Sequence, residues 1–423
     1  MQAVRYHFSI PKYLVTKAAG RWTPAVYTAR AFSALSLDDV PPPSLPGPDW
    51  LAIEPVYAGI CGTDLGTITG KTSPALAPFA SFPATLGHEV VGRVVDVGPG
   101  AGEFRPGDRI VVDPWISCRV RGLDPCPACE RGTPFLCRRA AEGRFGPGML
   151  IGYCSALPGG WSRRMVVHVS QAHRVPDGMS DERAVLVEPL SVALHGVLRA
   201  VAPDEHEERD FNRGLAPGFG PGETVLVIGA GTIGLAVVAA IRLLGLKCRV
   251  AVLARYPFQE ELARALGADA VIPRGRNAAV EAAKSLTSAP VYRPPIGPPV
   301  ITGGFGAVFD CAGTTASISD ALRVVQERGR VIVLGGAGQL AGVDWTFVWM
   351  REVHVLGSCG YGFEPAFGRH TYSVLFDLLA KADLPVERLI THRFPLTAYR
   401  EAIRCNLERA KTGAVKTVFC ESP

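Results

Sequence analysis

One apolar segment interrupted by a glycine cluster limits the possible folds of this chain more than any other feature. Residues 225–244 read VLVIGAGTIGLAVVAAIRLL, in which three glycines have the spacing G-x-G-x-x-G. This spacing suits a strand, a tight turn and a helix packed closely on the strand, with helix N–H groups facing an anion. The segment therefore predicts a dinucleotide-binding site made by Gly229, Ala230, Gly231, Thr232, Ile233 and Gly234.

The pattern of residues changes near residue 188. Up to about residue 187 the chain is rich in Gly, Pro and short β-branched runs such as residues 89–98, which indicates mostly antiparallel β structure. Beyond it, apolar strands alternate with helix-length segments, which predicts a parallel sheet with crossover helices. Residues 203–222 and 288–306 are expected to be surface insertions, and a helix is expected at residues 371–382.

The end of the second predicted strand bears on the choice of nicotinamide cofactor. An acidic residue there binds the ribose 2′-hydroxyl of NAD, whereas a basic residue suits the 2′-phosphate of NADP. Ala254 stands where the acid is expected and Arg255 follows it, which favours NADP over NAD. The alternative is that Arg255 is a solvated loop residue.

Two groups of residues have the side chains of zinc sites. The first combines sulfur, nitrogen and oxygen ligands and leaves a position open, as catalytic zinc sites do; its candidates are Cys61, His88 and either Glu89 or Glu188. The second group is four cysteines separated by seven, two and seven residues, which would close a structural zinc site; they are Cys118, Cys126, Cys129 and Cys137.

Each group also has a simpler interpretation. A lone Cys or His is more often a buried structural residue than a ligand. The pair Cys126 and Cys129 would also suit redox chemistry, and the whole loop an iron–sulfur cluster. Five cysteines are expected to be buried thiols, namely Cys154, Cys248, Cys359, Cys405 and Cys420. Four further side chains could line the substrate pocket or pack in the core, and we favour core packing; they are Trp115, His168, Trp345 and Trp349.

Composition excludes several classes of partner. The 423 residues carry 44 basic and 39 acidic side chains without a run of five like charges, so we expect neither nucleic acid nor membrane as a partner. The first residues lack the apolar core of a secretory signal, which leads us to expect a cytoplasmic protein. The composition, 48% hydrophobic, is sufficient for two globular domains.

In order and spacing these motifs resemble the zinc-containing medium-chain alcohol dehydrogenase family, in the branch with sorbitol and threonine dehydrogenases. The resemblance rests on CGTD (61–64), GHEVVGRVVDVG (87–98), the four-cysteine loop, VEPLSVALHG (187–196) and GAGTIG (229–234). It implies an α/β protein with a GroES-like, mainly β catalytic domain over residues 1–190. A Rossmann domain, a doubly wound parallel sheet, would follow over 191–359, and the catalytic domain would return over 360–423. Homodimers or homotetramers are implied as well.

The resemblance also implies a function. The chain would transfer a hydride between a secondary alcohol, polyol, sugar or amino alcohol and a nicotinamide cofactor, using one catalytic and one structural zinc. Cys61 and His88 would hold the catalytic zinc, Thr63 would pass on the substrate proton and Cys311 would lie near the nicotinamide. Two departures from the family are Gly66, where many relatives have a histidine, and the seven residues between Cys118 and Cys126.

Two other functions fit parts of the same pattern. A quinone or enoyl reductase of this fold would work without zinc, and would have no reason to keep the ligand residues. A non-catalytic dinucleotide-binding protein would keep its zinc ions for stability alone. Metal content and cofactor-linked turnover distinguish these alternatives from an alcohol dehydrogenase.

Overall fold

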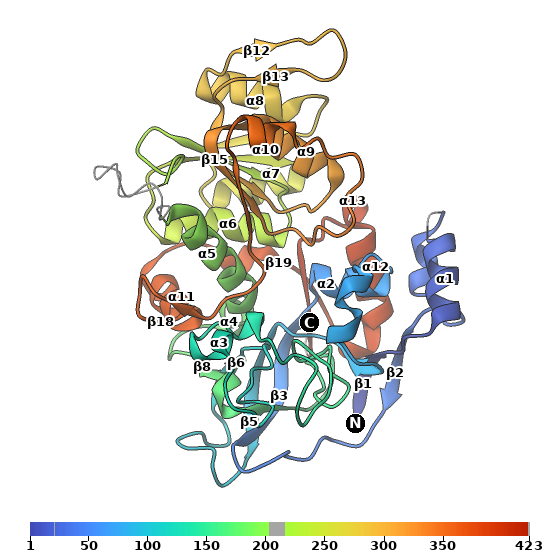
Figure 1. The fold of residues 1–423 in the computed structure, drawn as a ribbon. Helices are drawn as coiled ribbons and strands as arrows, with labels where there is room; N and C mark the ends of the chain where they lie inside the picture. The colour runs from blue at the N-terminus through green and yellow to red at the C-terminus, as the bar shows by residue number, and fades with distance from the viewer. Residues whose placement is uncertain (21, 203–215, 422–423) are drawn as a thin grey trace. The chain divides into compact units, whose positions relative to one another are not determined.

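The computed structural model describes residues 1–20, 22–202 and 216–421, which form two compact units. The first unit combines three segments, Met1–Glu188, Tyr361–Phe376 and Ile390–Pro423. The second consists of Pro189–Gly360 and Asp377–Leu389. The chain therefore leaves the first unit twice, after Glu188 and after Phe376, and its last segment ends in this unit; Figure 1 shows the fold.

The first unit is built on a seven-stranded sheet. Its order is β19-β20-β3-β5-β6-β8, and β7 also pairs with β3. All of its pairs are antiparallel except β19 with β20. The strands are β3 (Trp50–Gly59), β5 (Val90–Val97), β6 (Arg109–Val112), β7 (Met165–His168), β8 (Ala172–Arg174), β19 (Ile390–Phe394) and β20 (Lys416–Cys420).

A smaller antiparallel sheet and several short helices complete this unit. The sheet has the order β2-β1-β4, with β1 (Gln2–Tyr6), β2 (Leu35–Asp39) and β4 (Ala84–Thr85). The helices are α1 (Ile10–Ala19), α2 (Gly62–Ile68), α3 (Pro127–Glu130), α4 (Asp181–Val185), α12 (Tyr399–Leu407) and α13 (Arg409–Thr412). Short 3₁₀ helices lie at η1 (Pro24–Tyr27), η2 (Pro74–Phe79), η3 (Pro134–Leu136), η4 (Val169–Gln171) and η6 (Leu396–Ala398).

Trp161 lies in the core of this unit. Its side chain is fully buried, its indole N–H donates to the carbonyl of Gly59 at 3.0 Å, and its ring meets Phe419 edge-on at 5.3 Å. The same side chain thus contacts the end of β3 and the returning strand β20. The apolar core holds together the two strands that carry much of the site described below.

The second unit is a six-stranded parallel sheet in the order β11-β10-β9-β14-β15-β16. The order of strands reverses between β9 and β14, and dinucleotides bind at such a switch point. The strands are β9 (Thr224–Ile228), β10 (Arg249–Ala254), β11 (Ala270–Pro273), β14 (Phe305–Asp310), β15 (Val325–Val333) and β16 (His354–Gly357). The α/β fold expected from the sequence, a mainly β domain and a doubly wound parallel sheet, is thereby confirmed.

Helices connect these parallel strands. Within the second unit α6 packs beside α7, and α8 beside α9. The helices are α6 (Thr232–Leu243), α7 (Pro257–Ala265), α8 (Ala278–Thr287), α9 (Thr315–Val324) and α10 (Thr346–Met350), with η5 (Val386–Leu389). Two further helices, α5 (Val187–Val201) and α11 (Thr371–Lys381), run from one unit into the other along the chain.

Several local expectations can be compared with this fold. The helix expected at residues 371–382 is α11, and the insertion at 288–306 contains a small hairpin of β12 (Val291–Tyr292) and β13 (Val300–Ile301). Residues 203–215 of the other expected insertion lie outside the described residues. Among the helices that the structure describes, none is long and apolar enough to cross a membrane.

The expectation of core packing was wrong for three side chains. Trp345 and Trp349 are 54% and 74% exposed, because Trp345 is the N-cap of α10 and Trp349 lies within it, and this five-residue helix buries none of its residues. Cys359 is exposed as well. Trp115 and His168 are buried, as expected.

Candidate active site and metal centres

Cys61 stands at the junction between β3 and α2. It is the N-cap of α2, and its backbone N–H donates to Asp64 Oδ2 at 2.9 Å, which fixes the backbone that carries the thiol. The Thr63 hydroxyl lies on the exposed first turn of α2, 3.6 Å from Cys61 Sγ. The helix start therefore places a thiol and a hydroxyl side by side.

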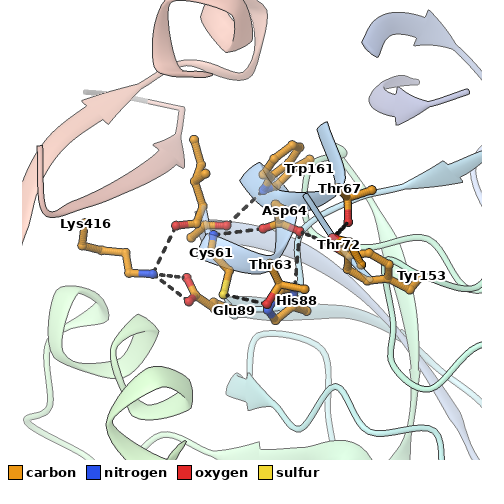
Figure 2. Close-up of polar contacts among 12 residues, drawn as sticks. Cys61, Thr63, Asp64, Thr67, Thr72, His88, Glu89, Tyr153, Trp161 and Lys416 are labelled. Atoms are coloured by element: carbon orange, nitrogen blue, oxygen red, sulfur yellow. Dashed lines mark hydrogen bonds and ion pairs between the residues drawn. The ribbon is translucent and has the colours of Figure 1, made fainter. Parts of the chain in front are cut away.

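His88 lies behind this thiol and is held by Asp64. Its Nδ1 is 3.5 Å from Asp64 Oδ1, which also accepts a hydrogen bond of 3.0 Å from the Tyr153 hydroxyl (Figure 2). Burial lowers the pKa of His88, but Asp64 and Cys61 outweigh it and raise the pKa well above the usual value. The surroundings of His88 thus favour positive charge, as at a cation site.

Sequence reasoning did not single out Asp64 or Tyr153. An acid three residues after a helix-capping residue was a usable signal for Asp64. Tyr153 comes from a loop 89 residues away, and local sequence gives no indication of that contact.

Glu89 forms a buried ion pair with Lys416. The Lys416 ammonium, on β20, lies 2.6 Å from both carboxylate oxygens and donates to the Ile60 carbonyl at 3.3 Å. Figure 2 shows this ammonium directed at the carboxylate. Gly59 makes room for the pair, because a Cβ there would lie 1.9 Å from Glu89 Oε2.

Glu188 is the second carboxylate of the site and begins α5. It is 5% exposed, and the Tyr361 hydroxyl donates to its Oε1 at 3.0 Å. Burial raises the pKa of Glu188 to about 7, while His88 lowers it and Glu89 adds to the increase. This carboxyl group therefore changes charge near neutral pH, a property of acid–base residues.

The first cluster suits a catalytic zinc. Ligand atoms of Cys61, His88 and Glu89 all lie within 4.8 Å of one another. One sulfur, one nitrogen and one oxygen ligand form a set that zinc accepts with a fourth position open. Of the two glutamates left open by the sequence, Glu89 belongs to this cluster by distance, and Glu188 is coupled to it by charge.

The four cysteines of the second cluster also come together. The sulfurs of Cys118, Cys126, Cys129 and Cys137 all lie within 4.8 Å of one another. Burial raises the pKa of Cys126, but the N–H groups of Arg138, Cys129 and Ala128 bring it down to about 6, whereas burial raises the pKa values of Cys129 and Cys137. Four sulfur ligands with no open position fit a structural zinc. Cys118 belongs to this cluster although seven residues separate it from Cys126.

The long spacing is filled by a buried arginine. Arg121 is 1% exposed and donates hydrogen bonds to the carbonyls of Glu142, Gly146 and Ala140. Its guanidinium thus ties the start of the four-cysteine lobe (residues 118–137) to the loop that follows it. The residues between Cys118 and Cys126 therefore include an arginine that stabilises the lobe.

A third cluster lacks the geometry of a metal site. Asp113, His173 and His370 also have ligand atoms within 4.8 Å of one another, but the two imidazole rings stack, with centroids 4.5 Å apart and planes at 27°. A metal ion binds to an imidazole nitrogen in the plane of the ring. Because the rings of His173 and His370 are stacked, one metal ion cannot lie in both ring planes close to a nitrogen of each. The Tyr372 N–H also donates to His370 Nδ1, which leaves the ring hydrogen on Nε2, 3.3 Å from Asp113. We assign a structural pair here.

The glycine motif has the expected conformation. Gly229 has a φ of +100°, and a Cβ on Gly234 would lie 1.8 Å from the Gly229 carbonyl oxygen. Gly231 is the N-cap of α6. The turn between β9 and α6 therefore requires glycine for its backbone and for close packing, which is the geometry that admits a pyrophosphate.

The two other predicted cofactor residues lie at the ends of neighbouring strands. Arg255 directly follows β10 and places its guanidinium 5.2 Å from the ring centre of Tyr256. Cys311 directly follows β14, and its N–H donates to the Ile228 carbonyl at 3.0 Å. Both lie at the carboxyl edge of the sheet, beside the glycine turn.

Comparison with protein families gives two matches. Residues 47–177 match the model of the alcohol dehydrogenase GroES-like domain, and residues 232–381 match that of the zinc-binding dehydrogenases. The two models lie in the first and second halves of the chain and together cover more than half of it.

Individual proteins are similar over nearly the whole chain. L-idonate 5-dehydrogenase of Vitis vinifera is 30% identical over 89% of this chain and 89% of its own length. A probable (R)-acetoin-forming diacetyl reductase of Saccharomyces cerevisiae is 28% identical, covering 90% and 83%. Sorbitol dehydrogenase of Ovis aries is 26% identical, covering 87% and 89%. A zinc-binding dehydrogenase structure from Sinorhizobium meliloti, bound to NADP, is 28% identical with a TM-score of 0.68, covering 91% and 96%.

Proposed function

Because the chain belongs to the zinc-containing medium-chain alcohol dehydrogenase family, and is a zinc- and nicotinamide-dependent alcohol dehydrogenase, we propose which of its residues carry that reaction. The observation that carries the proposal is the cluster of Cys61, His88 and Glu89 with the Thr63 hydroxyl beside it. A zinc-independent reductase of the same fold would have no use for this cluster.

In this proposal Cys61, His88 and Glu89 hold the catalytic zinc. Bound there, zinc would supply a Lewis acid that lowers the pKa of an alcohol, and the nicotinamide would accept the hydride. Asp64 lies 3.5 Å from His88 Nδ1, so an imidazole paired with it there would keep Nε2 for the metal. The Lys416 ammonium neutralises the negative charge of Glu89, which lies in a buried site together with other acidic side chains.

In this proposal Thr63 and Glu188 take part in transferring the proton that the substrate hydroxyl releases. The exposed Thr63 hydroxyl, next to Cys61, would accept a hydrogen bond from the substrate hydroxyl and release its own hydrogen to water as the alcohol is oxidised. Glu188 accepts a hydrogen bond from the Tyr361 hydroxyl, and its raised pKa suits it to exchange protons near neutral pH. Gly66 supplies no side chain for the histidine relay of many relatives, so the proton leaves by another route.

The cofactor in this proposal is NADP. The pyrophosphate would lie at the turn that contains Gly229, Gly231 and Gly234, at the N-terminus of α6. Arg255 at the end of β10 would pair with the 2′-phosphate, and Ala254 offers no carboxylate for the 2′-hydroxyl of NAD. Cys311 would lie near the nicotinamide end.

The substrate in this proposal is a polyol, a sugar acid or another alcohol with neighbouring hydroxyl groups. The names of the similar proteins support this class, since L-idonate and sorbitol carry several adjacent hydroxyls. A homodimer or homotetramer and a cytoplasmic location remain predictions.

The test is a cofactor-reduction assay at 340 nm over a panel of polyols, sugars, secondary alcohols and threonine. Each substrate is tried with NAD and NADP, before and after chelation, and zinc per chain is measured in parallel. Activity lost on chelation supports the proposal. For Cys61→Ser we expect loss of turnover and of one zinc per chain with cofactor binding retained, and loss of cofactor binding as well would contradict the assignment.

A further inference from the structure

A chain of two tyrosines leads away from Glu188. The Tyr361 hydroxyl donates to Glu188 Oε1, and the Tyr372 hydroxyl lies 2.9 Å from that of Tyr361 and 3.0 Å from the Val112 carbonyl oxygen. Tyr372 has a single hydroxyl hydrogen, so it donates to one of these two oxygens at a time. Both tyrosine side chains are fully buried. Neither is part of the zinc or cofactor sites proposed above.

These tyrosines limit the freedom of the Glu188 carboxylate. The hydrogen bond from Tyr361 holds Oε1 of a buried carboxylate that lies close enough to His88 and Glu89 for their charges to shift its pKa. Tyr372 in turn limits the position of Tyr361, because its hydroxyl lies between that of Tyr361 and the Val112 carbonyl at the end of β6. A buried side chain held at both ends has few alternative rotamers.

Tyr361 precedes a hairpin that rests on the four-cysteine lobe. The hairpin consists of β17 (Phe363–Glu364) and β18 (Arg369–His370), and the Phe363 N–H donates to the Gly132 carbonyl at 2.8 Å. The approach is close, since a Cβ on Gly132 would lie 2.6 Å from the Cβ of Phe363. The Tyr361 ring also meets Trp115, and Trp115 meets Phe135 of the lobe.

Thr371 closes the hairpin beside Tyr361. Its N–H and its hydroxyl both bond the Gly362 carbonyl at 2.8 Å, and its hydroxyl oxygen lies 2.7 Å from Glu364 Oε1. All of these side chains are buried. The position of Tyr361 is therefore determined by the lobe on one side and by the hairpin closure on the other.

We propose that Tyr361 and Tyr372 are positioning residues that fix the Glu188 carboxylate, and that the four-cysteine lobe supports them through the hairpin. This inference rests on the proposed function of Glu188. It gives the structural zinc site a role in catalysis, since the lobe that it braces also orients a carboxylate of the active site.

The first test removes single hydroxyl groups. For Tyr361→Phe we expect kcat to fall about tenfold, as for other residues that orient groups at a metal site, with a smaller fall for Tyr372→Phe. The matched control is Tyr6→Phe, a buried tyrosine of the same unit outside this network, which should retain normal kcat.

A double-mutant cycle separates positioning from general stability. If Tyr361 acts through Glu188, adding Tyr361→Phe to Glu188→Gln should lower kcat no further. The d–d absorption of the protein with Co²⁺ in the catalytic site should also change in Tyr361→Phe and stay normal in Tyr6→Phe. Additive losses of kcat with an unchanged spectrum would overturn the proposal. The spectrum can be recorded even if no substrate is turned over, so failure of the proposed function would be recognised separately.

A second test examines the contact with the lobe. Gly132 and Gly122 both have a φ of +70°, but a Cβ on Gly122 would have open space, whereas one on Gly132 would collide with Phe363. Gly132→Ala and Gly122→Ala therefore carry the same backbone strain. We expect only Gly132→Ala to lower kcat and alter the Co²⁺ spectrum while four-cysteine zinc is retained, and equal behaviour of the two variants would refute the role of the lobe.

Discussion

Replacing Lys416 with methionine tests how the site balances its charges. The Lys416 and Glu89 side chains are 2% and 1% exposed, and the ammonium lies 2.6 Å from both carboxylate oxygens. Methionine keeps most of the side-chain volume but leaves a buried carboxylate without its partner. Breaking a buried ion pair from one side costs about 3–5 kcal/mol, because the remaining charge stays buried. We expect this loss in the free energy of unfolding of Lys416→Met.

The assay is urea unfolding followed by tryptophan fluorescence, with zinc present and after chelation. A bound zinc ion would replace part of the lost positive charge, so the loss should be smaller with zinc present. Lys411→Met, on the exposed side of α13, is the control for removal of a lysine. The double variant Glu89→Gln with Lys416→Met should lose less than the sum of the two single variants. A Lys416→Met variant as stable as Lys411→Met, or strictly additive losses, would refute this account.

Three further predictions address the cofactor, the proton and the pH dependence of stability. Arg255→Ala should raise the KM for NADP about tenfold, because one charge-assisted hydrogen bond is lost, and should leave the KM for NAD unchanged. An equal rise of both KM values in steady-state kinetics would contradict the contact between Arg255 and the 2′-phosphate. Thr63→Ala should lower kcat about 100-fold at constant KM while Thr63→Ser retains activity, and a poorly active serine variant would exclude the hydroxyl as the acting group. Burial next to His370 lowers the pKa of His173 from 6.5 to about 3, so the unfolded chain takes up a proton near pH 6.5 that the folded protein resists. This contribution to stability is present above pH 6.5 and is lost as the pH falls towards 3, amounting to about 2 kcal/mol at pH 5. In His173→Phe this part of the acid destabilisation should vanish from denaturation curves at pH 7.5 and 5, and parallel losses in both proteins would disprove it.

The features that sequence predicted well depend on local patterns. The turn between β9 and α6 was recognisable because its glycines are required by the backbone itself, at a φ of +100° for Gly229 and at a close approach for Gly234. The four-cysteine cluster was recognisable because its ligands lie within twenty residues and only their sulfurs had to converge. In both cases the chemistry is concentrated in one short segment.

The features that sequence missed depend on contacts between distant segments. Lys416 is 327 residues from Glu89, and Tyr361 is 173 residues from Glu188, so neither spacing could suggest a pair. The two exposed tryptophans were misjudged for a related reason. Trp345 and Trp349 are apolar enough for a core, but the short helix α10 offers them no buried face.

The position of Lys416 depends on the register of the sheet. β20 runs antiparallel to β3 with Val418 opposite Gly59, and the Ile60 N–H donates to the Thr417 carbonyl at 2.9 Å. Continuing this register brings Lys416 opposite Cys61, two residues beyond the end of β3. A shift of one residue would turn Lys416 to the opposite face of the sheet and leave Glu89 without its cation. The returning strand therefore does more than close the sheet, because the charge balance of the zinc site requires that β20 pair with β3 in this register alone.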